Sequence, residues 1–308
     1  MGKTALITGV NGFIGQYAAR HFMDRGWVVV GLDTRMGETG FDQSLFHFHR
    51  ITLPSEELIP VVQERRPQVC VHCAGPASVD LSMIEPAVDF AASVQTTFHL
   101  LDTLRRFAPE CQVIYLSSAA VYGNPESLPI RETVNPSPIS PYGFHKLVGE
   151  TLCAEFSKVY GLPAAAVRIF SAYGVGLKRQ VLWDICRKAL TQPSVKLKGT
   201  GKESRDFVNV EDVARAIYLL AQKASSHFEI YNLASGIETT IKELSTLILD
   251  GLGLHLPVEF DGTITPGTPL NWRADISRLV RAGFRPEISL EKGIRGFTEW
   301  CRSEIQRR

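Results

Sequence analysis

Residues 3–15 read Lys-Thr-Ala-Leu-Ile-Thr-Gly-Val-Asn-Gly-Phe-Ile-Gly, and this stretch decides the fold. The apolar run at residues 5–7 predicts a short buried strand. Glycines follow at positions 9, 12 and 15, and apolar residues at helical spacing come after them. A strand, a glycine-rich turn and a helix start together present free backbone N–H groups to a pyrophosphate. The stretch therefore predicts a dinucleotide-binding turn.

Each glycine of this turn has a physical role. Gly9 allows the tight turn, Gly12 lets the backbone approach the phosphates, and Gly15 lets the helix pack closely on the strand. Residues 28–30 predict a second strand, and Asp33 follows it near the spacing of a ribose-binding carboxylate. Asp33 would accept hydrogen bonds from the ribose hydroxyls and repel a 2′-phosphate, so we expect NAD rather than NADP as the cofactor.

The composition of the 308 residues excludes several classes of function. Hydrophobic residues make up 44% and charged residues 21%, which is ordinary for a globular protein. The formal net charge of +1 gives no general attraction to nucleic acid or to an acidic membrane. No apolar run has the length of a membrane span, and the sequence begins on a strand rather than on a signal-peptide pattern. We expect a cytoplasmic protein that binds neither nucleic acid nor membranes.

The six cysteines include a CxxC pair, Cys70 and Cys73, which is a redox or metal signal in other contexts. Here the pair falls on a predicted strand, where residues three apart point to opposite faces. We interpret the cysteines as buried free thiols, and the sequence predicts no metal site.

Strand and helix patterns alternate through about residue 170, which predicts an α/β fold with a doubly wound parallel sheet of the Rossmann type. After Ser171 the alternation loosens, and one later segment returns to the sheet. We therefore predict a dinucleotide-binding domain at residues 1–170 plus 207–234 and a smaller α/β substrate lobe at residues 171–206 plus 235–308. Long helices are expected at residues 86–107 and 142–160, and short mixed elements near the C-terminal end, up to about residue 300.

Tyr142 and Lys146 are spaced i, i+4 at the start of a predicted helix, so they share one face. A free tyrosine has a pKa of about 10 and is a poor base at neutral pH. A neighbouring lysine ammonium and the positive charge of oxidised nicotinamide would favour the phenolate and lower that pKa. Ser118, at the end of a predicted strand, could hydrogen-bond the same substrate oxygen. These residues predict proton removal from an alcohol coupled to hydride transfer.

With these residues in place, the chain resembles the extended short-chain dehydrogenase/reductase family, in its NAD-dependent nucleotide-sugar epimerase/dehydratase branch. The resemblance covers nearly the whole chain and is carried by residues 8–15, Asp33, 72–75, 117–123, 141–146, 168–174, 205–210, 231–236 and 274–277. It implies that Ser118, Tyr142 and Lys146 are the catalytic residues. It also implies a homodimer built through a four-helix bundle; the alternative is that both faces of these helices are covered within one chain.

The resemblance also implies the binding residues. Those expected to bind NAD are Gly9, Asn11, Gly12, Phe13, Ile14, Gly15, Asp33, Thr34, Cys73, Ala74, Gly75, Tyr142, Lys146 and Phe170. Those expected to bind a nucleotide-diphosphate sugar are Ser118, Tyr142, Ser171, Arg205 and Arg273. The guanidinium of Arg205 would grip the diphosphate, because its planar fork matches phosphate oxygens. The alternative for Arg205 is an ion pair with Glu203 or Asp206.

Several positions depart from the family pattern. Ala119 and Ala120 stand where dehydratases of this branch carry acidic residues, which argues against a 4,6-dehydratase. Ser93 and Ser171 replace family asparagines. The family's Arg-Pro-Gly-Asp reads Thr265-Pro-Gly-Thr268 here, so a second phosphate arginine is missing, and Arg273 or Lys178 is the candidate replacement. The sugar and the nucleotide base stay open.

The leading hypothesis is NAD-dependent epimerisation at C4 through a 4-keto intermediate, with polysaccharide biosynthesis as the expected pathway. The second hypothesis is a one-way 4-keto-sugar reductase that consumes NAD(P)H. The third, from another class, is a cofactor-sensing protein that kept the fold and lost catalysis.

Overall fold

A seven-stranded parallel sheet forms the centre of the computed structural model, which describes residues 2–37, 40–223, 227–263, 267 and 269–307. Across the sheet the strands run β3 (Phe46–Arg50), β2 (Val28–Asp33), β1 (Thr4–Thr8), β4 (Val69–His72), β5 (Gln112–Ser118), β6 (Ala164–Ile169) and β10 (Glu229–Leu233). The order reverses between β1 and β4, and such a switch point is where open α/β sheets bind ligands.

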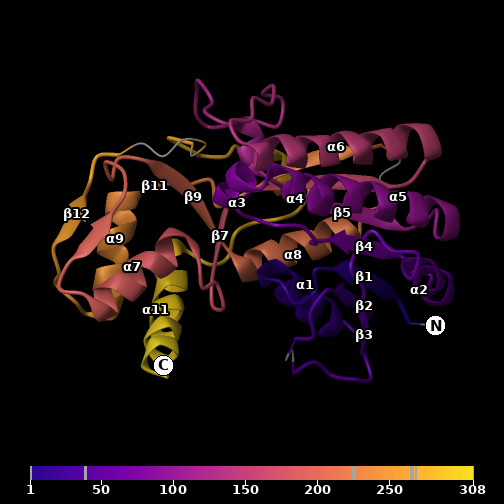
Figure 1. Cartoon of the computed structure of the whole chain (residues 1–308), viewed down its shortest axis with the longest axis horizontal. Helices are drawn as coiled ribbons and strands as arrows, with labels where there is room; N and C mark the ends of the chain where they lie inside the picture. Colours follow the sequence, from indigo (N-terminus) through magenta and orange to yellow (C-terminus); the bar gives the residue numbers. More distant parts are fainter. Residues whose placement is uncertain (1, 38–39, 224–226, 264–266, 268, 308) are drawn as a thin grey trace.

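Helices cover both faces of the sheet, which is why its inner strands are apolar on both sides. One face carries α1 (Phe13–Met23) and α8 (Val210–Ala221), and the other carries α2 (Leu58–Arg65), α5 (Thr96–Phe107) and α6 (Pro141–Tyr160). Figure 1 shows α5 and α6 side by side along one face of this large lobe. No helix in the described part of the chain combines the length and apolarity needed to cross a membrane.

A smaller lobe lies beside the sheet and holds the C-terminal end, whereas the N-terminal end lies in the large lobe (Figure 1). Its strands are β7 (Ser171–Tyr173), β9 (Ser204–Asn209) and β11 (Glu238–Thr240), which form one sheet, and β8 (Val195–Leu197) and β12 (Val258–Phe260), which form another. The helices α7 (Gln180–Thr191), α9 (Ile241–Leu252) and α11 (Leu290–Gln306) close its core.

Short helical elements follow the carboxyl ends of β4 and β5 and pack against α6. They are α3 (Val79–Ile84), α4 (Pro86–Phe90), a π-helical segment Ala91–Gln95 and a 3₁₀ turn Ala119–Tyr122. The helix α10 (Ser277–Arg281) contacts β10, and Leu279 and Phe284 belong to the core of the large lobe. The domain boundaries at residues 170, 207 and 235 stay a prediction.

The predicted fold class is confirmed, but three elements differ from expectation. Residues 290–306 form one long helix where short elements were expected, because Gly293 and Gly296 weaken the helical signal; a Cβ at Gly293 would overlap the Tyr173 hydroxyl. The helix expected at residues 86–107 contains the π-helical segment. The strand β4 ends at His72, so Cys73 lies beyond it, and all six cysteines are free.

Candidate active site

The glycine turn after β1 touches the turn after β4. Gly9 has φ +65°, and a Cβ there would lie 2.9 Å from the Ala74 nitrogen. A Cβ at Gly15 would overlap the Gly9 carbonyl oxygen. Gly12 caps α1 without a side chain, so no side chain occupies the N–H groups of the first turn, at Phe13 and Ile14. These features fit a bound pyrophosphate.

Asp33 closes the same turn from the end of β2. Its Oδ2 accepts a hydrogen bond from the Asn11 backbone N–H at 3.0 Å, and Oδ1 accepts one from Arg35 N–H at 3.3 Å. The Thr34 hydroxyl lies 3.4 Å from Oδ1. The carboxylate therefore lies next to the glycine turn, as a ribose-binding group must. We call the glycine turn, Asp33 and residues 73–75 the cofactor edge.

The small residues after β4 are fixed by a buried chain of hydrogen bonds that sequence reasoning missed. The Ala74 N–H donates to the Thr8 hydroxyl at 3.1 Å, and this oxygen lies 2.7 Å from Nδ1 of His72. Nε2 of His72 lies 3.1 Å from the Thr97 hydroxyl. Burial lowers the pKa of His72 to about 3, so the ring is neutral and acts as a structural link. Gly75 follows with φ +120°.

The structure brings Ser118, Tyr142 and Lys146 together at the carboxyl end of β5. Tyr142 occupies the first turn of α6, where its backbone N–H donates to the Ser82 hydroxyl at 3.1 Å. Ser118 ends β5, where its hydroxyl accepts a hydrogen bond from the Ala120 backbone N–H at 3.1 Å, and it is one of the groups that lower the pKa of the Tyr142 phenol. Lys146 is buried, and its Nζ donates to the Leu116 carbonyl at 2.8 Å. Tyr115 of β5 pairs with His72 of β4, and Lys146 Nζ lies 5.2 Å from the centre of the Tyr115 ring, which places this cluster beside the cofactor edge.

The electrostatics of Tyr142 involve more groups than the sequence analysis named. Burial raises the pKa of Tyr142, and the groups that lower it are Ser118, by a hydrogen bond, and Arg179, by its charge. Lys146 was expected to lower this pKa together with oxidised nicotinamide, and its Nζ lies 5.9 Å from the centre of the Tyr142 ring. The lysine is itself buried, which lowers its own pKa to about 8. Arg179 was missed because it lies in a loop 37 positions further along the sequence.

Arg205 projects from β9, and it makes no ion pair with a described residue. Its Nη1 donates to the Ser204 carbonyl at 2.7 Å and to the Leu270 carbonyl at 3.0 Å. Burial lowers the pKa of Arg205 to about 10. The alternative ion pairs are not formed, because Glu203 is bound by Thr200 and Gly201 instead.

The Arg205 guanidinium lies over the ring of Trp272, a residue that the sequence analysis did not name. The Arg205 guanidinium lies 5.3 Å from the centre of the Trp272 ring. The indole is anchored by a hydrogen bond of 3.0 Å to the Gly123 carbonyl, and it packs edge-on against Phe170. A stacked guanidinium with unused N–H groups suits an anionic ligand.

The buried carboxylate of Asp206 links β9 to residues 235–236 and 274 by hydrogen bonds. It is fully buried and accepts hydrogen bonds from Ser235 N–H at 2.8 Å and hydroxyl at 2.7 Å, from Gly236 N–H at 3.0 Å and from Ala274 N–H at 3.0 Å. Burial raises the pKa of Asp206 to about 6 against these donors. We call Arg205, Asp206 and Trp272 the substrate side.

The remaining predicted binding residues lie at different places. Ser171 begins β7, and the half-buried Arg273 follows Trp272. Lys178, the other candidate for the missing phosphate arginine, has its Nζ 2.6 Å from Glu304. Thr265 and Thr268 lie outside the described residues.

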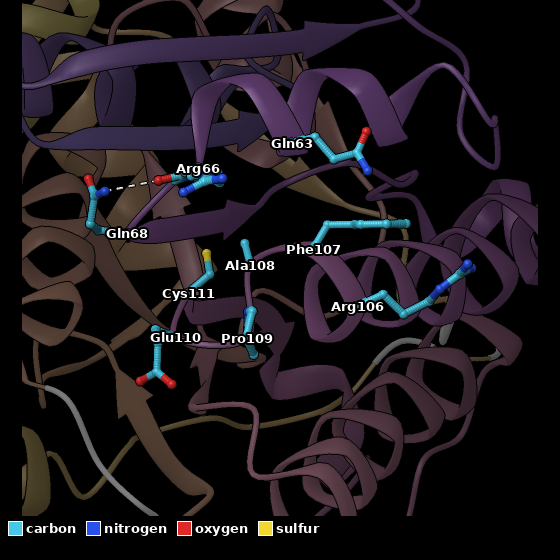
Figure 2. A pocket seen from close by; sticks show the side chains of 10 residues that line it. Gln63, Arg66, Gln68, Arg106, Phe107, Ala108, Pro109, Glu110 and Cys111 are labelled. Atoms are coloured by element: carbon cyan, nitrogen blue, oxygen red, sulfur yellow. Dashed lines mark hydrogen bonds between the residues drawn. The ribbon is translucent and has the colours of Figure 1, made fainter.

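A surface hollow of about 670 Å³ lies at the amino ends of β4 and β5. It is separate from the cluster of Ser118, Tyr142 and Lys146, which lies at the carboxyl end of β5. Figure 2 shows it between the ends of α2 and α5, with Gln68 donating a hydrogen bond to the Arg66 carbonyl. The residues around it precede β4 and β5, whereas Ser118 and Ala74 follow these strands.

The comparisons with known proteins agree with this geometry. A family model described as the NAD dependent epimerase/dehydratase family matches residues 5–234. The UDP-glucose 4-epimerase of Mycolicibacterium smegmatis is 28% identical over 316 residues, covering 98% of this chain and 99% of that protein.

Two solved structures have nearly the same fold. MoeE5 in complex with UDP-glucose and NAD is 27% identical with a TM-score of 0.90 and covers 98% of this chain and 99% of its own. The UDP-glucose 4-epimerase of Thermotoga maritima with UDP-glucose is 27% identical with a TM-score of 0.89 and the same coverage.

Proposed function

The chain belongs to the NAD-dependent epimerase/dehydratase family, and on that premise we propose that it epimerises a nucleotide-diphosphate sugar at C4. The observation that carries the proposal is the cluster of Ser118, Tyr142 and Lys146 beside the cofactor edge. A buried phenol, whose pKa burial raises and a neighbouring serine lowers, can serve as a base for a sugar hydroxyl.

The roles of the side chains follow from this arrangement. The glycine turn and Asp33 would hold NAD, which would supply reversible hydride transfer at C4. Tyr142 would take the proton of the C4 hydroxyl, Ser118 would hydrogen-bond the same oxygen, and Lys146 would favour the phenolate. The 4-keto sugar would then turn, so that the hydride returns to the opposite face and Tyr142 gives the proton back. The cofactor ends unchanged, which fits a tightly held NAD.

The residues after Ser118 support epimerisation over dehydration. Ala119 and Ala120 are buried in the 3₁₀ turn, with 0% and 7% of their surface exposed. Elimination of water needs an acid and a base next to the substrate. These two positions offer neither.

We propose a uridine diphosphate sugar as the substrate, with Arg205 and Arg273 on the diphosphate. The similar solved structures named above hold UDP-glucose, which supports the choice of nucleotide. The Arg205 guanidinium lies over the Trp272 ring, and the sugar itself is left to experiment. Supply of activated sugars for polysaccharide biosynthesis is the proposed pathway.

We propose a homodimer formed through α5 and α6, which would make a four-helix bundle. The large apolar side chains of Phe98, Phe144, Val148 and Val159 are 39–64% exposed on these helices. Apolar side chains gathered on neighbouring helices are typical of an interface. A charged Val148→Glu variant should be monomeric by light scattering, whereas a wild-type monomer would contradict the proposal.

The free state of all six cysteines supports a cytoplasmic location.

The test incubates the pure protein with UDP-, GDP-, CDP- and dTDP-sugars and follows new isomers by NMR. Copurified NAD, a C4 epimer and no net NADH are the expected results, with Tyr142→Phe as the inactive control. Stoichiometric loss of NADH with a 4-keto sugar would instead show the reductase. Bound NAD with no turnover of any sugar would support the cofactor-sensing protein.

A further inference from the structure

A buried ion pair lies at the carboxyl end of β5, and the reaction described above does not use it. The side chains of Glu150 on α6 and Arg168 on β6 are 3% and 2% exposed. Arg168 holds the carboxylate at both oxygens, with Nε to Oε1 at 2.9 Å and Nη2 to Oε2 at 2.7 Å. The Ser117 hydroxyl donates a further hydrogen bond to Oε1 at 2.5 Å. The pair therefore joins one helix to two strands of the large sheet.

The pair fixes α6 next to the proposed catalytic residues. Glu150 follows Lys146 by four positions, so both side chains lie on the same face of α6. Lys146 Nζ donates to the carbonyl of Leu116, and the Glu150 carboxylate accepts from the next residue of the strand, Ser117. Ser118 ends the strand directly after them. Two neighbouring contacts thus hold one face of α6 against the last three residues of β5.

The helix and the strand approach each other closely at the same turn. A Cβ at Gly149 would overlap the Tyr115 hydroxyl, which lies 3.5 Å from the Lys146 carbonyl oxygen. A backbone this close to the strand leaves little room for the helix to shift. Any displacement of α6 at this turn would move Tyr142 and Lys146 relative to Ser118.

Arg168 also supports the 3₁₀ turn that follows β5. Its guanidinium lies 4.7 Å from the centre of the Tyr122 ring, and Tyr122 is the last residue of that turn. The Tyr122 hydroxyl donates to Oδ1 of Asn232 at 2.7 Å. Ser117, Arg168 and Asn232 are cross-strand neighbours on β5, β6 and β10. With Glu150 and Tyr122 they form one buried polar layer beneath the catalytic cluster.

Stability alone does not account for a pair of this kind. The desolvation of two buried charges roughly offsets their attraction, and well-packed apolar residues of similar volume are often as stabilising. Nη1 of Arg168 is buried and has no hydrogen-bond partner among the described residues, which adds a further cost. What the pair does supply is orientation, because a guanidinium that binds both oxygens of a carboxylate fixes their relative geometry.

We propose that Glu150 and Arg168 are positioning residues, which hold α6 in the place where Tyr142 and Lys146 meet Ser118. The consequence for turnover rests on the proposed function. The position of α6 itself is a property of the folded chain.

The kinetic test uses the double variant Glu150→Leu/Arg168→Met, in which apolar side chains of comparable size replace the pair. Its denaturant midpoint should stay close to that of the wild type, because the desolvation cost of the pair is removed together with its attraction. With UDP-sugars, kcat should fall by about 10²-fold with KM little changed, because the reacting groups are misplaced while the substrate still binds. Glu150→Gln keeps one of the two oxygens, so kcat should fall by less, about tenfold.

A spectroscopic test reads the position of α6 without substrate. In protein labelled with 3-fluorotyrosine, with the signal assigned by Tyr142→Phe, the ¹⁹F resonance of Tyr142 should shift in the double variant. The matched control is Asp102→Leu/Arg105→Met, which removes an ion pair of 2.6 Å on α5. The Arg105 guanidinium lies 4.6 Å from the centre of the Tyr160 ring, so the control should shift the Tyr160 resonance and leave the Tyr142 resonance and kcat unchanged.

An unchanged kcat or an unmoved Tyr142 resonance in the double variant would overturn the inference, and so would equal effects of the control. If the double variant does not fold, the same two measurements on Glu150→Gln still decide. If the wild-type protein converts no nucleotide sugar, the proposed function fails while the resonance still tests the position of α6, so the two failures are distinguishable.

Discussion

The cofactor edge and the substrate side hold their functional groups by different means. At the cofactor edge the backbone makes the contacts, because Gly9 and Gly15 leave no room for a side chain. On the substrate side, one buried carboxylate, Asp206, joins a strand of the small lobe to Ser235 and Ala274. The comparison teaches that the first region is sensitive to any added atom, whereas the second is sensitive to charge.

The largest expected effect comes from the catalytic cluster between these regions. Tyr142→Phe removes the proposed base and should lower kcat by about 10²–10⁴-fold, with NAD binding and thermal stability little changed. Steady-state kinetics with bound-cofactor fluorescence would measure both. Unchanged turnover would show that the phenol is not the base.

A single methyl group added at Gly15 should disrupt the structure of the cofactor edge. Gly15→Ala places a Cβ against the Gly9 carbonyl, so we expect a loss of about 3 kcal/mol of unfolding free energy and loss of NAD binding. Gly296→Ala is the matched control, since a Cβ there meets no atom within 4 Å and lies on α11. Equal effects of the two substitutions in denaturant unfolding would contradict this account.

The substrate side should respond to pH instead. The pKa of Asp206 in the folded protein is raised from 3.8 to about 6, so its contribution to stability is fully present below pH 3.8 and lost as the pH rises through about 6. The loss is at most roughly 3 kcal/mol. Denaturant unfolding between pH 4 and 7 should show this slope in wild-type protein and not in Asp206→Asn. Parallel curves would argue against a raised pKa.

The smallest effect is expected at the diphosphate. Arg205→Lys keeps the charge but loses the planar fork over Trp272, so KM should rise about tenfold with kcat little changed. The same change at Arg273 is the comparison, and it tests whether both guanidinium groups bind the substrate. A fall in kcat with KM unchanged would show that Arg205 has another role.

Much of the cofactor edge could be predicted because its pattern is local. The glycine spacing lies within one strand–turn–helix, Asp33 ends the strand that follows it, and Tyr142 and Lys146 are about one helix turn apart. The matching family model confirms the family assigned from them. The roles of the individual site residues stay predictions. The long helix α11 was missed because packing against Tyr173 selects glycine where helix propensity opposes it.

By itself, the sequence determined the doubly wound sheet, the glycine turn and the candidate base, since these depend on hydrophobic period and on residues a few positions apart. Only the tertiary structure decided that the Arg205 guanidinium lies over the Trp272 ring and that the charge of Arg179 lowers the pKa of Tyr142. It also decided that Asp89 lies within hydrogen-bond distance of His145. These contacts join residues far apart in the chain. Their electrostatic effects depend on burial, which spacing in a sequence does not measure.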